Sequence, residues 1–251
     1  MIAFLPDGIT WGAAAALMVV SLLSSALTAA VGIGGGIVFL VALTFVVPIE
    51  ALIALHGIIQ VGSNAGRTIV LARQVNYRLL LPFVLGATVG VAIGAALVTD
   101  LPEATILLAI GVFVTVTTWV KPPPFGRGQP AVLAIGGAGA SILTMFIGAT
   151  GPFVIAMMRQ TGLSHIGLVA TNGAAMTVQH ALKVIAFGIL GFNFMPWLPL
   201  VAALIASGFV GTLIGARLLR SLPEQALRMA LKVVLTMLGL HLIVRGVLDL
   251  L

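Results

Sequence analysis

Apolar runs long enough to cross a lipid bilayer follow one another along almost the whole chain. A membrane-spanning helix needs about 20 mostly apolar residues. The runs of roughly this length are 10–31, 50–72, 78–99, 103–120, 131–147, 164–190, 197–216 and 224–246. Hydrophobic residues make up 61% of the sequence and charged residues only 7%, whereas soluble domains carry about 25% charged residues. We therefore predict an all-α integral membrane protein, a polytopic helix bundle.

The helices leave no room for a soluble module, so we expect one transmembrane domain over residues 1–251. The first run is expected to stay in the mature protein, because only Asp7 precedes it and it is longer than a signal-peptide core. The absence of cysteine excludes disulfides and thiolate metal sites. The net charge of +6 comes mainly from basic residues in short loops, which indicates contact with lipid rather than nucleic acid. Neither composition nor charge predicts an oligomeric state.

Two apolar runs are too short to span a membrane, and each follows a cluster of glycines. Residues 37–47 follow Gly32–Gly36, and residues 153–159 follow Gly148–Pro152. At 1.5 Å per residue neither run crosses a hydrocarbon core about 30 Å thick, so we predict half-helices or re-entrant arms. The amino end of a half-helix favours an anion, because its backbone N–H groups are free. The alternative is that the glycines serve close helix packing.

The second half of the chain repeats the first. Gly90–Ala95 followed by Leu101–Glu103 returns as Gly211–Ala216 followed by Leu222–Glu224, at an offset of about 121. The two glycine breaks correspond at an offset of about 116. We predict one repeat over about 10–120 and a second over about 131–247, joined by the hydrophilic linker 121–130.

The loop charges indicate that the two repeats are inserted in opposite directions. Arg73 and Arg78 place the 73–78 loop of the first half in the cytoplasm, while its counterpart, residues 191–197, carries no charge. Arg217 and Arg220 place the following loop of the second half in the cytoplasm as well. Inverted repeats with glycine-broken helices are typical of alternating-access transporters with a site near the midplane. Both termini then face outward.

A polar stripe lies along one helix of each half. The first stripe is His56, Gln60, Ser63, Asn64 and Arg67, and the second is Asn172, Gln179, His180 and Lys183. The offset of about 116 places Arg67 on Lys183. Ionisable groups inside a bilayer normally face the bundle interior or a wet pathway. The alternatives are polar contacts between helices and, for the two cations, snorkelling to the membrane surface.

All six acidic residues lie at predicted helix ends or chain termini. They are Asp7, Glu50, Asp100, Glu103, Glu224 and Asp249. No carboxylate is deep enough to bind sodium or relay a proton, which disfavours cation transport and leaves histidine as the proton carrier. The sequence contains no known catalytic motif. No acidic residue is predicted to be buried where it could orient a catalytic histidine. We expect no cofactor, no metal and no enzymatic activity.

The glycine motifs resemble those of a known family. Gly32–Gly36 after the first membrane helix, Pro48 and Gly148–Pro152 resemble the TauE/SafE sulfite-exporter family, also called the toluene-sulfonate uptake permease family. The resemblance covers nearly the whole chain and implies a multi-pass inner-membrane transporter of sulfite, sulfonates or related anions. Ala149 and Thr150 depart from the fuller glycine run of the family. Because the family contains importers and exporters, the resemblance implies no direction.

We therefore expect a secondary transporter that moves a small anion, with its site between the two glycine breaks. Arg67 and Lys183 would attract the anion, and polar side chains of both stripes would orient it. The expected site residues are Gly34, Gly35, Gly36, Asn64, Arg67, Gly148, Thr150, Gly151, Asn172, Gln179, His180 and Lys183. Two rival interpretations are an anion channel of the same fold, and a membrane-embedded enzyme or non-transporting scaffold.

Overall fold

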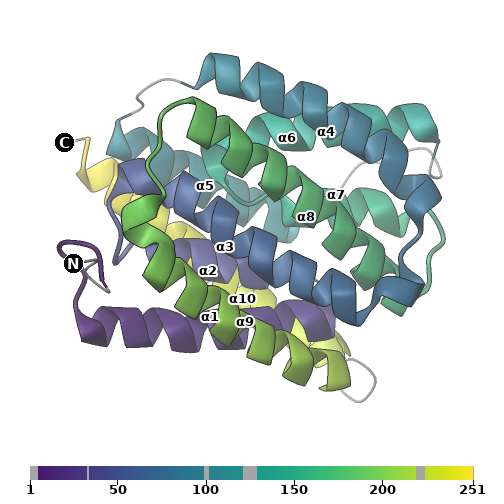
Figure 1. Ribbon diagram of the computed structural model, residues 1–251, viewed down its shortest axis with the longest axis horizontal. Helices are drawn as coiled ribbons and strands as arrows, with labels where there is room; N and C mark the ends of the chain where they lie inside the picture. Colours follow the sequence, from purple (N-terminus) through teal and green to yellow (C-terminus); the bar gives the residue numbers. More distant parts are fainter. Residues whose placement is uncertain (1–4, 33, 99–101, 121–128, 219–223, 251) are drawn as a thin grey trace.

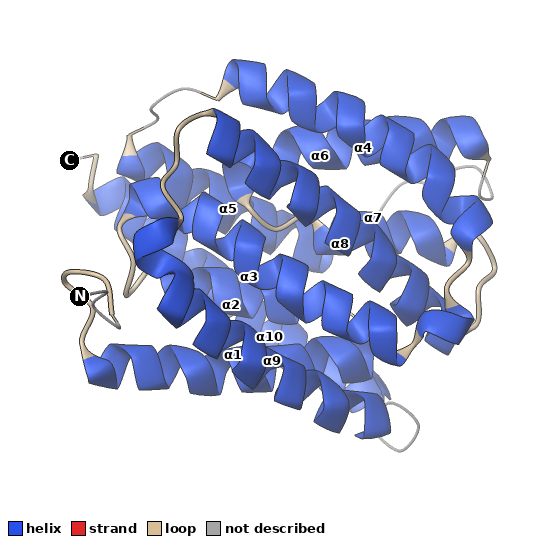
Figure 2. Ribbon diagram, viewed as in Figure 1, coloured by secondary structure: helices blue, strands red, loops and turns tan. Residues whose placement is uncertain are grey.

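The computed structural model describes residues 5–32, 34–98, 102–120, 129–218 and 224–250. All regular elements in these ranges are helical (Figure 2). They are α1 Trp11–Val31, α2 Gly35–Leu43, α3 Ile49–Val70, η1 Ala72–Gln74, α4 Tyr77–Leu97, α5 Glu103–Trp119, α6 Pro130–Ile147, α7 Gly151–Arg159, α8 His165–Ile189, η2 Met195–Trp197, α9 Leu198–Leu218 and α10 Glu224–Leu248. The predicted helix bundle is confirmed. Ile33, Arg220 and most of the predicted linker lie outside the described residues.

Helix boundaries follow the capping and breaking residues of the sequence. Thr10 caps α1 by accepting a hydrogen bond from the Ala13 amide, and Ser164 caps α8 through the Gly167 amide. The two short helices begin two residues earlier than predicted, directly at Gly35 and Gly151. Helix starts tolerate glycine and proline because the first amide groups have no helical partner.

Hydropathy alone identifies fewer crossings than the eight long runs predicted. By length and composition, five of the described helices can cross a membrane, and none of the five is α3 or α8. These two helices have 22 and 25 residues, and at 1.5 Å per residue they are about 33 and about 37 Å long. Their polar stripes lower their hydropathy, and both lie in the middle of the bundle (Figure 1). Lipid-facing hydropathy is not required of a helix that other helices enclose.

Helix pairs formed between the two halves have counterparts in which the halves swap roles. Helix α4 lies along α6, and α9 lies along α1; likewise α3 contacts α9 and α8 contacts α4. The two remaining principal pairs, α3 with α8 and α5 with α10, join corresponding helices. A Cβ at Gly90 would lie 2.2 Å from the Ala138 carbonyl oxygen, and one at Gly211 would lie 2.0 Å from that of Leu22. Ala138 and Leu22 occupy equivalent positions, so this exchange supports a two-fold relation between the halves.

Corresponding loops lie at opposite ends of the long helices. One surface hollow joins the start of α3 at Glu50, the start of α5 at Glu103 and the end of α8 at Phe187. A second hollow joins the α3–α4 loop, with Arg73, to the α7–α8 loop at Ser164. The start of α1 and the end of α10 lie at the same end of the bundle (Figure 1). Corresponding loops of the two halves thus lie at opposite ends of the bundle, and the repeat bounds of about 10–120 and 131–247 stay a prediction.

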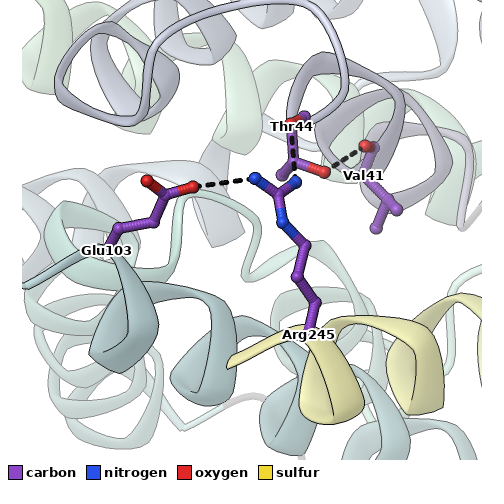
Figure 3. Close-up of polar contacts among 4 residues, drawn as sticks. All are labelled: Val41, Thr44, Glu103 and Arg245. Atoms are coloured by element: carbon purple, nitrogen blue, oxygen red, sulfur yellow. Dashed lines mark hydrogen bonds and ion pairs between the residues drawn. The ribbon is translucent and has the colours of Figure 1, made fainter. Parts of the chain in front are cut away.

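Arg245 links three helices at the end of the bundle where α3 and α5 begin, at Glu50 and Glu103. Arg245, in the last turn of α10, donates to Glu103 Oε1 at 2.9 Å and to the Thr44 carbonyl oxygen at 3.1 Å (Figure 3). Thr44 in turn donates from its hydroxyl to the Val41 carbonyl. A cation at the carboxyl end of a helix is stabilised by the helix dipole. The contact fixes the end of half-helix α2 to α5 and α10.

The inverted topology predicts which loops face the cytoplasm. The sequence contains no cysteine, so single Gln74→Cys and Met195→Cys variants have no background; both positions are exposed, at opposite ends of the bundle. In right-side-out vesicles, a membrane-impermeant maleimide should label the second variant, whereas the first should react only after permeabilisation. Labelling of both from the same side would contradict the inverted repeat.

Candidate functional site

The two breaks place the starts of two half-helices inside the bundle. Helix α1 ends at Val31 and is followed by its cap, Gly32, with φ +86°, before α2 begins at Gly35. Helix α6 ends at Ile147 and is followed by its cap, Gly148, also with φ +86°, before α7 begins at Gly151. Residues other than glycine rarely adopt this positive φ, which explains why a glycine stands at both breaks. The Ile37 and Phe153 amides bond to the carbonyls of Gly34 and Thr150, and Pro152 has no N–H. The first-turn amides left for the break are therefore those of Gly35 and Gly36 in α2 and that of Gly151 in α7.

A small cavity of about 40 Å³ lies between the two breaks. Its walls come from both half-helices and from the facing surfaces of α3 and α8. The lining residues are Thr28, Gly32, Gly34, Gly36, Ile37, His56, Gln60, Asn64, Arg67, Ala149, Gly151, Pro152, Asn172, Met176 and His180. A water needs about 10–15 Å³ of such volume, so the cavity has room for a group the size of a few waters.

Several polar atoms at the cavity are buried and have no hydrogen-bond partner. They are Arg67 Nε and Nη1, Asn172 Oδ1, His56 Nδ1 and His180 Nδ1. Leaving one buried polar group unpaired costs about 1–3 kcal/mol, and more for a charged one. Five such atoms on four cavity-lining side chains therefore indicate a polar ligand.

A chain of hydrogen bonds along α3 orients the Arg67 guanidinium. Asn64 Nδ2 donates to the Gln60 carbonyl at 2.7 Å and to Gln60 Oε1 at 3.1 Å, and Asn64 Oδ1 accepts from Arg67 Nη2. The missing side chain of Gly173 leaves space on α8, since a Cβ there would lie 3.1 Å from Arg67 Nε. Arg67 is only 1% exposed, which rules out snorkelling.

Lys183 is also fully buried, but its amine is placed differently from the Arg67 guanidinium. Nζ donates to the Gly148 carbonyl oxygen at 3.0 Å, which also accepts from Thr144 Oγ1 at 3.0 Å. Lys183 does not line the cavity. Its stem passes Gly57, where a Cβ would lie 2.8 Å from Lys183 Cε. The two cations that the repeat places at equivalent positions therefore make different contacts.

Four other predicted site residues lie outside the cavity lining: Gly35, Gly148, Thr150 and Gln179. Gln179 is occupied by neighbours, since its Nε2 donates to Ser141 Oγ at 3.0 Å and its Oε1 accepts from Thr150 Oγ1 at 3.3 Å. A Cβ at Gly35 would lie 1.8 Å from the Ser24 carbonyl oxygen, so this glycine serves close packing of α2 on α1.

The cavity brings together the remaining predicted residues with others that the site prediction omitted. Gly34, Gly36, Asn64, Arg67, Gly151, Asn172 and His180 are predicted residues that line it. His56 and Gln60 belong to the predicted polar stripe, so their helical spacing could have identified them as site residues. Thr28, Gly32, Ile37, Ala149, Pro152 and Met176 carry no polar periodicity that marks them, although Thr28 and Gly32 match Thr144 and Gly148 in the repeat.

The electrostatics of the cavity favour a negative ligand. None of the described lining residues is acidic, and Arg67 contributes a full positive charge. The amino ends of α2 and α7 add partial positive charges. The described part of the chain holds no cluster of three or more metal-ligating histidines or carboxylates. These features define a polytopic membrane protein with a buried, positively charged site between two half-helices.

Comparison with known proteins identifies the family. Residues 17–242 match the family described as sulfite exporter TauE/SafE, and the chain belongs to this family. It is 31% identical over 182 residues to the probable inner membrane transporter protein TsaS of Comamonas testosteroni, covering 68% of this chain and 73% of that protein. No solved structure matches the chain significantly. The protein is thus a membrane transporter and not an enzyme.

Replacing Lys183 separates a structural role from a functional one. In Lys183→Met the Thr144 hydroxyl still donates to the Gly148 carbonyl, and an unpaired buried charge is removed, so the melting temperature should stay the same or rise. Anion transport should fall about tenfold, the effect of about 1.4 kcal/mol of lost attraction. Lys232→Met, on α10 over Trp119, is the control. A lower melting temperature with normal transport would assign Lys183 to helix contacts.

Proposed function

We propose that the protein is a secondary transporter that moves a small oxyanion, such as sulfite or a small sulfonate, across the cytoplasmic membrane. The observation that carries the proposal is Arg67. Its guanidinium is buried, lines the cavity between two half-helix amino ends, and keeps two nitrogen atoms without a partner. A guanidinium donates in a fixed fork that matches planar or pyramidal oxyanions.

The other lining groups fit a ligand with several acceptor oxygens. Backbone amides at the starts of α2 and α7 add donors around Gly36 and Gly151. The volume of about 40 Å³ suits a headgroup of a few heavy atoms. The family description names sulfite. A sulfonate carries the same three oxygens on its sulfur atom, which bears one additional substituent. We therefore extend the proposal to small sulfonates.

The arrangement favours a carrier over a channel. The charged and polar side chains around the cavity are almost fully buried, with Arg67 at 1% and His56 at 0% exposure. A small site lined by buried side chains between two half-helices supports alternating access, in which the repeats expose the site to one side at a time. A channel requires a continuous water-filled path and conducts without binding each ion in a closed site.

Counterflow in proteoliposomes tests this function. Purified protein should exchange labelled sulfite and methanesulfonate, and choline should not be transported because the site is positive. Arg67→Met removes the guanidinium at similar volume and should lower exchange by roughly 100-fold, since hydrogen bonds to a charged group contribute about 1.5–3 kcal/mol. Lys232→Met should leave exchange unchanged, because Lys232 lies on α10 outside the cavity. Equal exchange by the wild type and Arg67→Met would overturn the proposal.

A further inference from the structure

Two buried histidines contact each other edge to face at the cavity. His56 on α3 and His180 on α8 have ring centroids 5.7 Å apart, and their planes meet at 82°. Both side chains line the cavity beside Arg67, and their exposures are 0% and 2%. Each ring keeps a buried Nδ1 atom without a hydrogen-bond partner. The two imidazoles therefore share one cavity with the Arg67 guanidinium.

The contacts of His56 determine which of its nitrogens is open to a proton. Nε2 lies 2.9 Å from the Gly36 carbonyl oxygen. A carbonyl oxygen only accepts hydrogen bonds, so Nε2 carries the hydrogen and donates it. In the neutral ring Nδ1 then bears the lone pair, and no donor of the protein contacts it. The ring is thus held as a base with one free acceptor position.

The charges around the two rings make proton and anion binding interdependent. Arg67 lies on α3 with His56, and Lys183 lies one turn beyond His180 on α8. Helices α1 and α6 contain no titratable residue, the α2 sequence contains none, and the Arg159 of α7 lies at the other end of that helix. A further positive charge on either imidazole is opposed by these cations while the site is empty. A bound oxyanion attracts that additional positive charge and so favours protonation of the imidazole.

We propose that His56 and His180 form a proton-binding site that is occupied together with the anion, so that the protein is a proton–anion symporter. The inference rests on the proposed anion site at Arg67. One proton from water bonds to the free Nδ1 lone pair as the anion binds, and it leaves to water when the anion leaves on the other side. One proton and one monovalent anion move together, so the transport cycle carries no net charge. By linkage, each ligand strengthens the binding of the other by the same factor.

A proteoliposome experiment with methanesulfonate, which stays ionised near neutral pH, tests the symport. An inside-alkaline gradient should accumulate the anion up to about tenfold per pH unit, the limit for one proton per anion. A potassium–valinomycin potential without a pH gradient should not drive uptake. A trapped pH dye should report one proton entering per anion.

Variants of the histidines locate the proton. His56→Gln and His180→Gln should lower the ratio of protons to anions, because glutamine retains a hydrogen-bond donor but has no titratable nitrogen. His241→Gln is the matched control, since His241 stacks on Phe45 with ring centroids 5.2 Å apart and does not line the cavity. Its ratio should equal that of the wild type.

The outcomes separate this inference from the proposed function. Methanesulfonate counterflow in the wild type without any response to the pH gradient would overturn the symport and leave the anion site intact. Absence of both counterflow and gradient-driven uptake would overturn the two together. A full proton ratio in both histidine variants would also reject the histidine pair as the proton site.

Discussion

The buried guanidinium of Arg67 is the constraint on which the other features of the site depend. A charge held inside a bilayer without a counter-charge is costly, and none of the described residues around the cavity is acidic. The protein orients this cation through Asn64 and Gln60, leaves space for it at Gly173, and leaves two of its nitrogens unpartnered. The amino ends of α2 and α7 add positive potential. In the function proposed above, a bound anion supplies the counter-charge that the protein does not.

The two glycine breaks convert ordinary helix termini into part of this site. A full helix would satisfy its amides internally, whereas α2 and α7 begin in the middle of the bundle and offer theirs to the cavity. Each break also exposes a carbonyl to a side-chain donor: the Gly36 oxygen accepts from His56, and the Gly148 oxygen accepts from Lys183. The halves thus share one architecture but place different chemistry at their breaks. One half therefore places its cation at the cavity, and the other places its cation against the carbonyl of its own break.

The sequence predicted the fold more completely than the site, for identifiable physical reasons. Apolar runs and glycine clusters specify helices and half-helices directly, because lipid requires internal backbone hydrogen bonding. The polar periodicity of α3 and α8 correctly marked a buried face, and Asn64, Arg67, Asn172 and His180 of that face line the cavity. Periodicity gives the face of a helix but not the end point of a long side chain. Hence Lys183, predicted as the equivalent of Arg67, reaches the Gly148 carbonyl instead, and Gln179 bonds to Ser141. Apolar lining residues such as Met176 have no sequence signal that separates them from ordinary core.

The most direct test of the anion site is to locate a bound anion by anomalous diffraction. Crystals grown with selenite, which has the shape and charge pattern of sulfite, should show a selenium peak between the starts of α2 and α7. Its oxygens should lie within hydrogen-bond distance, about 2.7–3.2 Å, of Arg67 Nε and Nη1. An empty cavity with selenium bound only at the membrane-exposed loops, at saturating selenite, would contradict the account.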